Sequence, residues 1–326
     1  MNTPPLPWQT LLQSIIRSPT ERQRLASALG VTNMTLSRWA SGESRPQRPH
    51  LLRLVQAIPP HLKPSLLKAL EQSYPDLPTW LAEETITHIP SEFFAQVLNM
   101  RTMIADNMRF WRMSELILKE TLTQLDPNRL GMAVKLIQCM PPHPRDGKIR
   151  SLRERAGKGT PPWSADLEHD VLFLGMESMC GYAVEVRHAV SDPDLRKNMT
   201  FPAYQDDYEM SAAVQPIRFE NRIAGCLLAS STQIGYFSQQ HLDQLGVFSN
   251  LIALVFDKKD FYSPQDIELR AMPIPELQRP ILANFRQRVT AHMISQRHHH
   301  SNPEIELTIW QEIETELLTL QEHLLP

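Results

Sequence analysis

The residues best suited to chemistry lie near the N-terminus, in the segment TNMTLSRWASG. Asn33 and Arg38 are natural readers of adenine and guanine, because an amide or a guanidinium can make paired hydrogen bonds to the edges of those bases. Thr35 and Ser37 add hydroxyl groups, and Met34 offers only an apolar contact, for instance to a thymine methyl. These are side-chain types that can contact the base edges of duplex DNA when one element presents them together.

Positive charge is concentrated in the same part of the chain. Residues 1–57 hold seven arginines and two glutamates, whereas the rest of the chain holds 26 basic and 34 acidic residues. A basic end on an acidic body is expected when only that end docks on phosphates. Arg45 and Arg48 suit the DNA backbone, which positions a protein without specifying a sequence. A solvated basic surface without a partner is the alternative.

Two short helices joined by a tight turn are predicted to position these side chains. The first is expected to be capped by Thr20 and to end at Gly30, since glycine readily adopts the left-handed conformation that closes a helix. Thr32 is expected to cap the second helix and Gly42 to end it. Two short helices joined through a glycine form a helix-turn-helix.

The spacing of small and apolar residues fits this geometry. Ala26 falls where the two helices cross and only a small side chain fits. Leu25, Leu29, Leu36 and Trp39 are predicted to close a small core with the apolar segments on either side. At this point the run QRLASALGVTNMTLSRWASGESRP resembles the XRE and lambda-repressor-like helix-turn-helix family. The matching residues are Gln23, Ala26, Gly30, Val31, Leu36, Ser37, Arg38, Trp39, Gly42 and Pro46.

That resemblance implies a bacterial-type transcription regulator with an all-α DNA-binding head over residues 1–58. The second helix would lie in the major groove, with its outward residues facing base edges and nearby phosphates. An unrelated helical hairpin is the alternative interpretation. The predicted DNA-binding residues are Asn33, Met34, Thr35, Ser37, Arg38, Arg45 and Arg48.

A helical connector is predicted over residues 59–126. Six prolines interrupt its first part, up to Pro90, which indicates a hinge with short helices. From Ser91, a good N-cap, the chain continues without proline or glycine and is expected to form one long helix or two abutting ones. Its apolar residues are spaced by three and four, which fits packing on its own domain as well as a coiled-coil dimer contact.

An α+β domain is predicted over residues 127–260. The strands AAVQPIRF and IAGCLLAS flank a turn at Glu220 and Asn221, and a helix is expected from Ser238. Earlier strands are expected in RLGMAVKLIQCM and KIRSLRER, and a helix in DLEHDVLFLGMES. The order resembles a GAF domain, which implies an antiparallel sheet with helices on one face and a ligand pocket on the other. The resemblance implies a sensor whose ligand or cofactor is unknown.

One cysteine raises the question of catalysis. The stretch SMCGYAVEV around Cys180 is similar to part of the free methionine sulfoxide reductases, a catalytic branch of the GAF fold. Those enzymes need a further cysteine in the loop before the SAAVQPI strand, and KNMTFPAYQDDYEM has none. The chain is therefore predicted not to be an enzyme. Cys180 is expected to be a small buried thiol, with a redox-sensing thiol as the alternative.

A run of basic residues lies near the second expected strand. Positive side chains in this position could bind an anionic ligand, whereas a solvated edge strand is the default interpretation. The run consists of Lys148, Arg150, Arg153, Arg155 and Lys158.

The C-terminal segment over residues 261–326 is predicted to be helical, with helices in PELQRPILANFRQRVTAHMI and PEIELTIWQEIETELLTLQEHLL. The last helix carries an apolar seam spaced by three and four, typical of a coiled coil. Packing of this seam on the sensor domain is the alternative. The seam residues are Trp310, Ile313, Leu317, Leu320 and Leu324.

The chain of 326 residues is long enough for two or three domains and has no apolar run that could cross a membrane and no signal peptide. We expect a soluble, cytoplasmic, homodimeric transcription regulator that binds double-stranded DNA. Its affinity for DNA is expected to be modulated by a small molecule bound in the GAF-like domain. No catalytic or metal-binding residues are assigned. The alternatives are a redox enzyme with an appended DNA-binding head and a protein-interaction scaffold.

Overall fold

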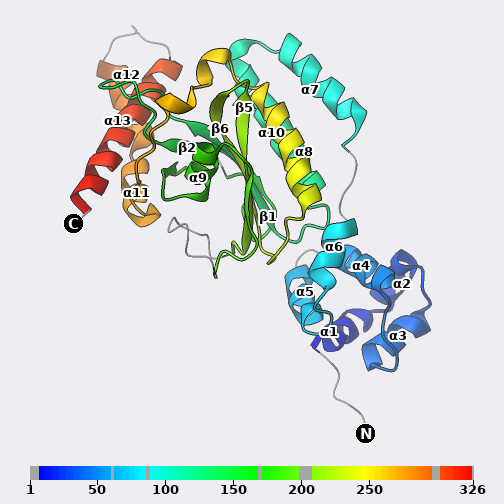
Figure 1. Ribbon diagram of the computed structural model, residues 1–326. Helices are drawn as coiled ribbons and strands as arrows, with labels where there is room; N and C mark the ends of the chain where they lie inside the picture. The colour runs from blue at the N-terminus through cyan, green and yellow to red at the C-terminus, as the bar shows by residue number, and fades with distance from the viewer. Residues whose placement is uncertain are drawn as a thin grey trace.

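A helical N-terminal region, an α+β domain and a group of C-terminal helices follow one another along the chain (Figure 1). This computed structural model describes residues 7–59, 62–84, 89–167, 171–197, 208–295 and 302–324. The N-terminal helices lie at one end of the molecule, and the C-terminal helices lie beside the opposite edge of the sheet (Figure 1).

The N-terminal region contains six helices, α1 (Pro7–Ile16), α2 (Pro19–Leu29), α3 (Asn33–Ser41), α4 (Arg48–Ala57), α5 (Lys63–Glu71) and α6 (Leu77–Glu84). Four of them enclose a core in which Trp8, Leu25, Leu36 and Leu54 are fully buried. This agrees with the expected burial of Leu25, Leu29, Leu36 and Trp39.

The ends of α2 and α3 are set by their capping residues. Gly30 ends α2 with φ 67° and Gly42 ends α3 with φ 83°, both left-handed as expected. The Thr32 hydroxyl caps α3 by accepting a hydrogen bond from the Thr35 backbone N–H. The expected cap at Thr20 is wrong, because Ser18 caps α2 and the following proline, with its preset φ, occupies the first helical position.

The long connector forms two helices, α7 (Ser91–Met103) and α8 (Asp106–Leu125). They separate at Ile104 and Ala105, whose backbone is extended. Ser91 was expected to cap this segment, but the N-cap is Pro90 and Ser91 is the first helical residue. Helix α8 packs on the sheet through Ile117, Leu118 and other buried side chains, so most of its apolar face is used within the chain.

The sheet has six strands in the order β3-β2-β1-β6-β5-β4, and every neighbouring pair is antiparallel. The antiparallel sheet expected from the sequence is thereby confirmed, including the hairpin at Glu220 and Asn221. The strands are β1 (Met132–Cys139), β2 (Leu152–Gly159), β3 (Phe173–Leu174), β4 (Val190–Asp192), β5 (Ser211–Phe219) and β6 (Arg222–Ser231).

The helix expected in DLEHDVLFLGMES is wrong. Among the described residues of that stretch, Phe173 and Leu174 pair with β2 as a short strand, and the next helix, α9 (Met179–Val186), begins only after it. Ser178 caps α9 by accepting from the Gly181 N–H. Apolar spacing alone could not separate a buried strand from a helix here, because both are rich in Leu, Val and Phe.

Helices cover both faces of the sheet. Helices α8 and α10 (Gln239–Ala253) pack on one face against Val134, Leu136 and Leu227. Helix α9 packs on the other face, against residues that include Ile137 and Cys226. A β-bulge interrupts β2 at Arg155. Leu136 of β1 pairs with Ala156 and Ile137 pairs with Glu154, so Arg155 is the extra residue.

The C-terminal segment forms α11 (Pro275–Leu282), α12 (Phe285–Ser295) and α13 (Asn302–Leu324), preceded by short 3-10 turns at Lys258–Asp260 and Pro264–Asp266. Ile313 and Leu317 of α13 are fully buried in a cluster that includes Phe173 of β3. The apolar seam of α13 therefore packs against the sheet edge of its own chain around Ile313 and Leu317, whereas Leu324 at its end is 53% exposed. Among the described helices, none is long and apolar enough to span a membrane.

The fold requires glycine at position 225, where the backbone of β6 approaches the backbone of β1 closely. Gly225 has φ 150°, and a Cβ atom there would overlap the carbonyl oxygen of Ile137. We expect Gly225→Ala to lower the free energy of unfolding by about 1–3 kcal/mol, because the clash falls on backbone that cannot move aside. Urea denaturation measures this change.

Gly246→Ala is the matched control. Gly246 lies within α10, where an added Cβ meets only the Gln215 side chain at 3.7 Å. This variant should be unchanged or stabilised by up to about 1 kcal/mol, since alanine favours a helix over glycine. Equal stability of the two variants would contradict the close approach at Gly225.

Candidate DNA-binding surface and arginine cleft

Helix α3 buries one face and exposes the other. Leu36, Trp39 and Ala40 are buried in the head core. The opposite face exposes Asn33, Met34, Ser37 and Arg38, with 65% of Met34 accessible, while Thr35 is half-buried at the start of the helix. The helix therefore presents most of the sequence-predicted residues together on one surface.

Hydrogen bonds hold the first turn of α3. The Asn33 Nδ2 donates to Gln23 Oε1 at 2.9 Å, which ties the amide to α2. The Thr35 hydroxyl lies 2.9 Å from that of Thr32. Ser37 Oγ donates to the Asn33 carbonyl within the helix. Asn33 is thus oriented before any partner arrives.

The three arginines of the predicted set have different surroundings. Arg38 Nε lies 3.9 Å from Glu43 Oε2, and both side chains are exposed, so water screens this pair. Arg45 is exposed beyond α3. Arg48 begins α4, and its guanidinium lies over the Trp80 ring, 5.5 Å from the centroid. Arg48 therefore contacts α6 rather than extending beside α3.

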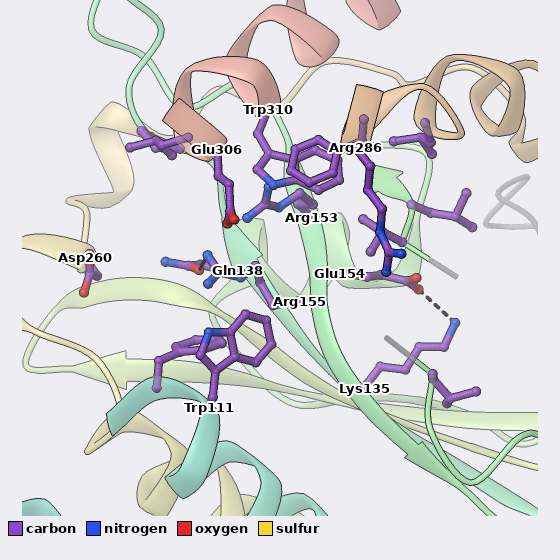
Figure 2. Close-up of a pocket in the computed structure, with 18 of the residues that line it drawn as sticks. Trp111, Lys135, Gln138, Arg153, Glu154, Arg155, Asp260, Arg286, Glu306 and Trp310 are labelled. Atoms are coloured by element: carbon purple, nitrogen blue, oxygen red, sulfur yellow. Dashed lines mark hydrogen bonds and ion pairs between the residues drawn. The ribbon is translucent and has the colours of Figure 1, made fainter. Parts of the chain in front are cut away.

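A cleft of about 1210 Å³ lies at the β2 side of the sheet, between α8 and the C-terminal helices (Figure 2). Its described lining combines aromatic rings with charged side chains of both signs. The charged residues are Lys135, Arg153, Glu154, Arg155, Asp260, Arg279, Arg286 and Glu306. We call this feature the arginine cleft.

Arg153 is the most buried charge in the arginine cleft, with only 5% of the residue exposed. Its guanidinium stacks on the Trp310 ring of α13 at 4.2 Å from the centroid (Figure 2). Its Nε and Nη1 are buried and make no hydrogen bond to any described part of the chain. Burial lowers the pKa of Arg153 well below its usual value, and the neighbouring Arg155 lowers it further.

Arg155 lies next to Arg153 and faces α8. Its guanidinium stacks on Phe110 at 4.3 Å and on Trp111 at 5.6 Å, and its Nη1 donates to Gln138 Oε1 at 2.8 Å. Burial lowers the pKa of Arg155 to about 10, so the group stays protonated at neutral pH. Two neighbouring guanidinium groups thus face the arginine cleft, each held by aromatic rings.

The other members of the basic run have partners outside the arginine cleft. Arg150 pairs with Asp146 and with Glu268, and Lys158 pairs with Asp166. Lys148 donates to the Gln265 carbonyl at 2.7 Å. The sequence indicated positive charge near β2 but could not select Arg153 and Arg155. The rings that hold these two side chains come from distant parts of the chain, Trp310 for Arg153 and those of α8 for Arg155.

The three cysteines are buried free thiols, one on α9 and two on the strands beneath it. Cys139, Cys180 and Cys226 belong to one apolar cluster, which agrees with the expectation that Cys180 is a small buried thiol. Burial raises the pKa of the Cys139 thiol to about 12 and that of Cys226 well above its usual value, so these two thiols are protonated at neutral pH. The Cys180 thiol lies close to Cys226 and raises the pKa of Cys226 further.

No protein-family model and no curated protein matches the chain. Similar solved structures include the type II free methionine-R-sulfoxide reductase from Thermoplasma acidophilum, at 18% identity over 44% of this chain and 94% of that chain, with a TM-score of 0.32. A GAF domain from Acinetobacter phosphoenolpyruvate-protein phosphotransferase is 13% identical over 51% of this chain and 93% of that chain, with a TM-score of 0.34.

A third similar structure is the free methionine-R-sulfoxide reductase from Neisseria meningitidis in complex with its substrate. It is 14% identical over 52% of this chain and 92% of that chain, with a TM-score of 0.32. About half of the chain is therefore similar to both GAF domains and enzymes. The expectation that the chain is not an enzyme is corrected by these similarities, because two of the three structures are reductases.

A buried carboxyl near Arg153 makes the stability of the fold depend on pH. Glu314 of α13 is buried, and its carboxylate accepts a hydrogen bond from the Ser151 hydroxyl. Burial raises the pKa of Glu314 to about 7, although Ser151 and Arg153 oppose this shift. The stability contributed by the protonated carboxyl is present below the ordinary pKa of 4.5 and is lost as the pH rises through 7.

We expect Glu314→Gln to gain stability relative to wild type as the pH rises from 4.5 to 7, by at most about 3 kcal/mol. The glutamine keeps the hydrogen bond to Ser151 and cannot ionise. Asp126 and His241, whose pKa values burial shifts to about 6 and about 4, titrate in both proteins and drop out of the difference. The measurement is the unfolding free energy of both proteins, from urea denaturation at several pH values. A difference between the two proteins that stays constant from pH 4.5 to 7 would refute the raised pKa of Glu314.

Proposed function

We propose that the chain is a DNA-binding transcription regulator whose head reads a specific duplex sequence through α3. The observation that carries this proposal is the two-sided character of α3: Leu36 and Trp39 anchor it in the head core while Asn33 and Arg38 face outward together. The left-handed turn at Gly30 fixes α3 against α2. This arrangement suits insertion of α3 into the major groove.

Within that groove the exposed side chains have separable roles. Asn33 and Arg38 would make hydrogen bonds to base edges, and Met34 would contact an apolar group such as a thymine methyl. Arg45 would bind the phosphate backbone and set the position of the head. Arg48 would act mainly through α6, since its guanidinium already lies over Trp80.

The α+β domain would act as a GAF-like sensor that sets the placement of the head. Lys63 of α5 donates to the buried Asn128 carbonyl at 2.7 Å, and Phe93 of α7 packs edge-on against Phe248 of α10. These contacts connect the connector, which follows the head in the chain, to the sheet and its covering helix. In a homodimer, a change at these contacts would alter the distance between two heads and hence their fit to two half-sites.

We expect Arg38→Ala to weaken binding to the preferred duplex by at least about 1 kcal/mol, because it removes a paired contact to a base edge. The duplex is first selected from a random library with the full-length protein, and affinity is then measured by gel shift. Arg218→Ala is the control, since this exposed arginine on β5 carries the same charge far from α3.

Unchanged affinity in Arg38→Ala would contradict the docking of α3. Equal losses in Arg38→Ala and Arg218→Ala would mean that binding follows total charge rather than a base contact. Failure of the library to yield any enriched sequence would contradict specific DNA binding and favour the protein-interaction alternative.

A second candidate function is the reduction of a sulfoxide by thiols. Cys180 and Cys226 lie in one apolar cluster and so bring two thiols together, as needed for a reaction that forms one disulfide and converts a sulfoxide to a thioether and water. We expect any such turnover of free methionine sulfoxide, with dithiothreitol as reductant, to be lost in Cys180→Ser. Absence of turnover by the wild-type protein, or equal turnover by the variant, would remove this candidate.

A further inference from the structure

Arg153 is a buried cation whose hydrogen-bonding capacity is only partly used. With 5% of the residue exposed and Nε and Nη1 unpaired, its guanidinium lacks the partners that a buried charge normally has. Glu306 and Glu314 of α13 attract it electrostatically, yet among the described residues no carboxylate lies within salt-bridge distance. Burying unpaired charged donors is costly, so the site is suited to an anion from outside the chain.

Aromatic rings hold the two guanidinium groups in place. Trp310 stacks on Arg153 from one side of β2, and Phe110 and Trp111 stack on Arg155 from α8. A planar guanidinium fixed in this way keeps its donors aimed and loses little entropy when an oxyanion binds. Figure 2 shows both groups between these rings and facing the arginine cleft.

The charge of the arginine cleft also favours an anion. Its described lining has five basic and three acidic side chains, which leaves an excess of two positive charges. Lys135 and Glu154 form an ion pair at 2.9 Å and so offset each other (Figure 2). An anion with one or two negative charges would balance the excess.

The size of the arginine cleft and one exposed ring point to an organic ligand. Its volume of about 1210 Å³ is above that of most small-molecule pockets, which measure about 300–1,000 Å³, and far larger than an inorganic anion needs. Trp310 already stacks on Phe285 at 3.9 Å, whereas Trp111 remains 47% exposed beside Arg155. Trp111 is thus placed to stack on a planar group attached to the anion.

We propose that the arginine cleft binds a small aromatic oxyanion, with its phosphate or carboxylate on Arg153 and Arg155 and its ring against Trp111. Trp310 and Glu306 of α13 form part of the wall, so the C-terminal helices complete the site. This position at the β2 edge differs from the α9 face, which is filled by apolar side chains. The ligand would bind whether or not the head binds DNA.

Isothermal titration calorimetry on the full-length protein tests the ligand class. The probes are phenyl phosphate, benzoate, inorganic phosphate and the cationic benzylamine. We expect phenyl phosphate, benzoate or both to bind at least tenfold more tightly than inorganic phosphate and benzylamine. Whichever of phenyl phosphate and benzoate binds more tightly identifies the preferred oxyanion. Binding of neither aromatic anion, or equal binding of benzylamine, would overturn the proposal.

Variants test the assigned residues with the tighter-binding probe. Arg153→Met should weaken binding at least tenfold and raise the melting temperature of the unliganded protein, because it removes a buried unpaired charge. Lys158→Met is the matched control on the same strand, since Lys158 pairs with Asp166 and does not line the arginine cleft. It should leave the affinity unchanged.

Two further variants keep the test decisive if Arg153→Met does not fold. Arg155→Met should weaken binding of the aromatic anion at least tenfold. Trp111→Ala should weaken binding of the aromatic anion by a larger factor than binding of inorganic phosphate, because only the aromatic anion loses a ring contact with Trp111. Wild-type affinity in any of these folded variants would overturn the role assigned to that residue, and wild-type affinity in both arginine variants would overturn the site.

Discussion

The structure depends on the central pairing of β1 with β2 and β6. This pairing is close enough that Gly225 leaves no room for a side chain against the Ile137 carbonyl. One face of the sheet then receives α8 and α10, against which α7 also packs, and the other receives α9. The edge next to β2 receives the C-terminal helices. The sheet thereby positions the arginine cleft, whereas α3 is held by the core of the head.

The two candidate sites use charge differently. The exposed face of α3 keeps its arginine in water, where it would be drawn to DNA phosphates and can make a base contact without a large desolvation cost. The arginine cleft keeps Arg153 buried and partly unpaired, and Glu314 stands nearby with its pKa raised to about 7. Groups held in this unfavourable way reduce stability until a ligand compensates, which is common at binding sites.

Local signals in the sequence were sufficient for the main hairpin and for most ends of α2 and α3. Gly30, Thr32 and Gly42 act within a few residues of their own position, so the last residue of α2 and both ends of α3 could be predicted, whereas α2 begins after Ser18 instead of Thr20. Pairing across long distances could not. The short strand at Phe173 forms only because β2 is available beside it, and the arginine cleft exists only because Trp310 packs against Arg153. Positive charge near β2 was visible in the sequence, but its burial was not.

The most direct test of the central claim is methyl NMR on the protein labelled at its methionines. Met34 lies on the proposed DNA-reading face of α3 and is 65% exposed, while Met103 and Met176, which are 83% and 60% exposed, lie outside the head. Upon addition of the selected duplex, the Met34 methyl signal should shift and the signals of Met103 and Met176 should stay in place. A duplex that binds the protein without moving the Met34 signal would contradict the reading of DNA by α3.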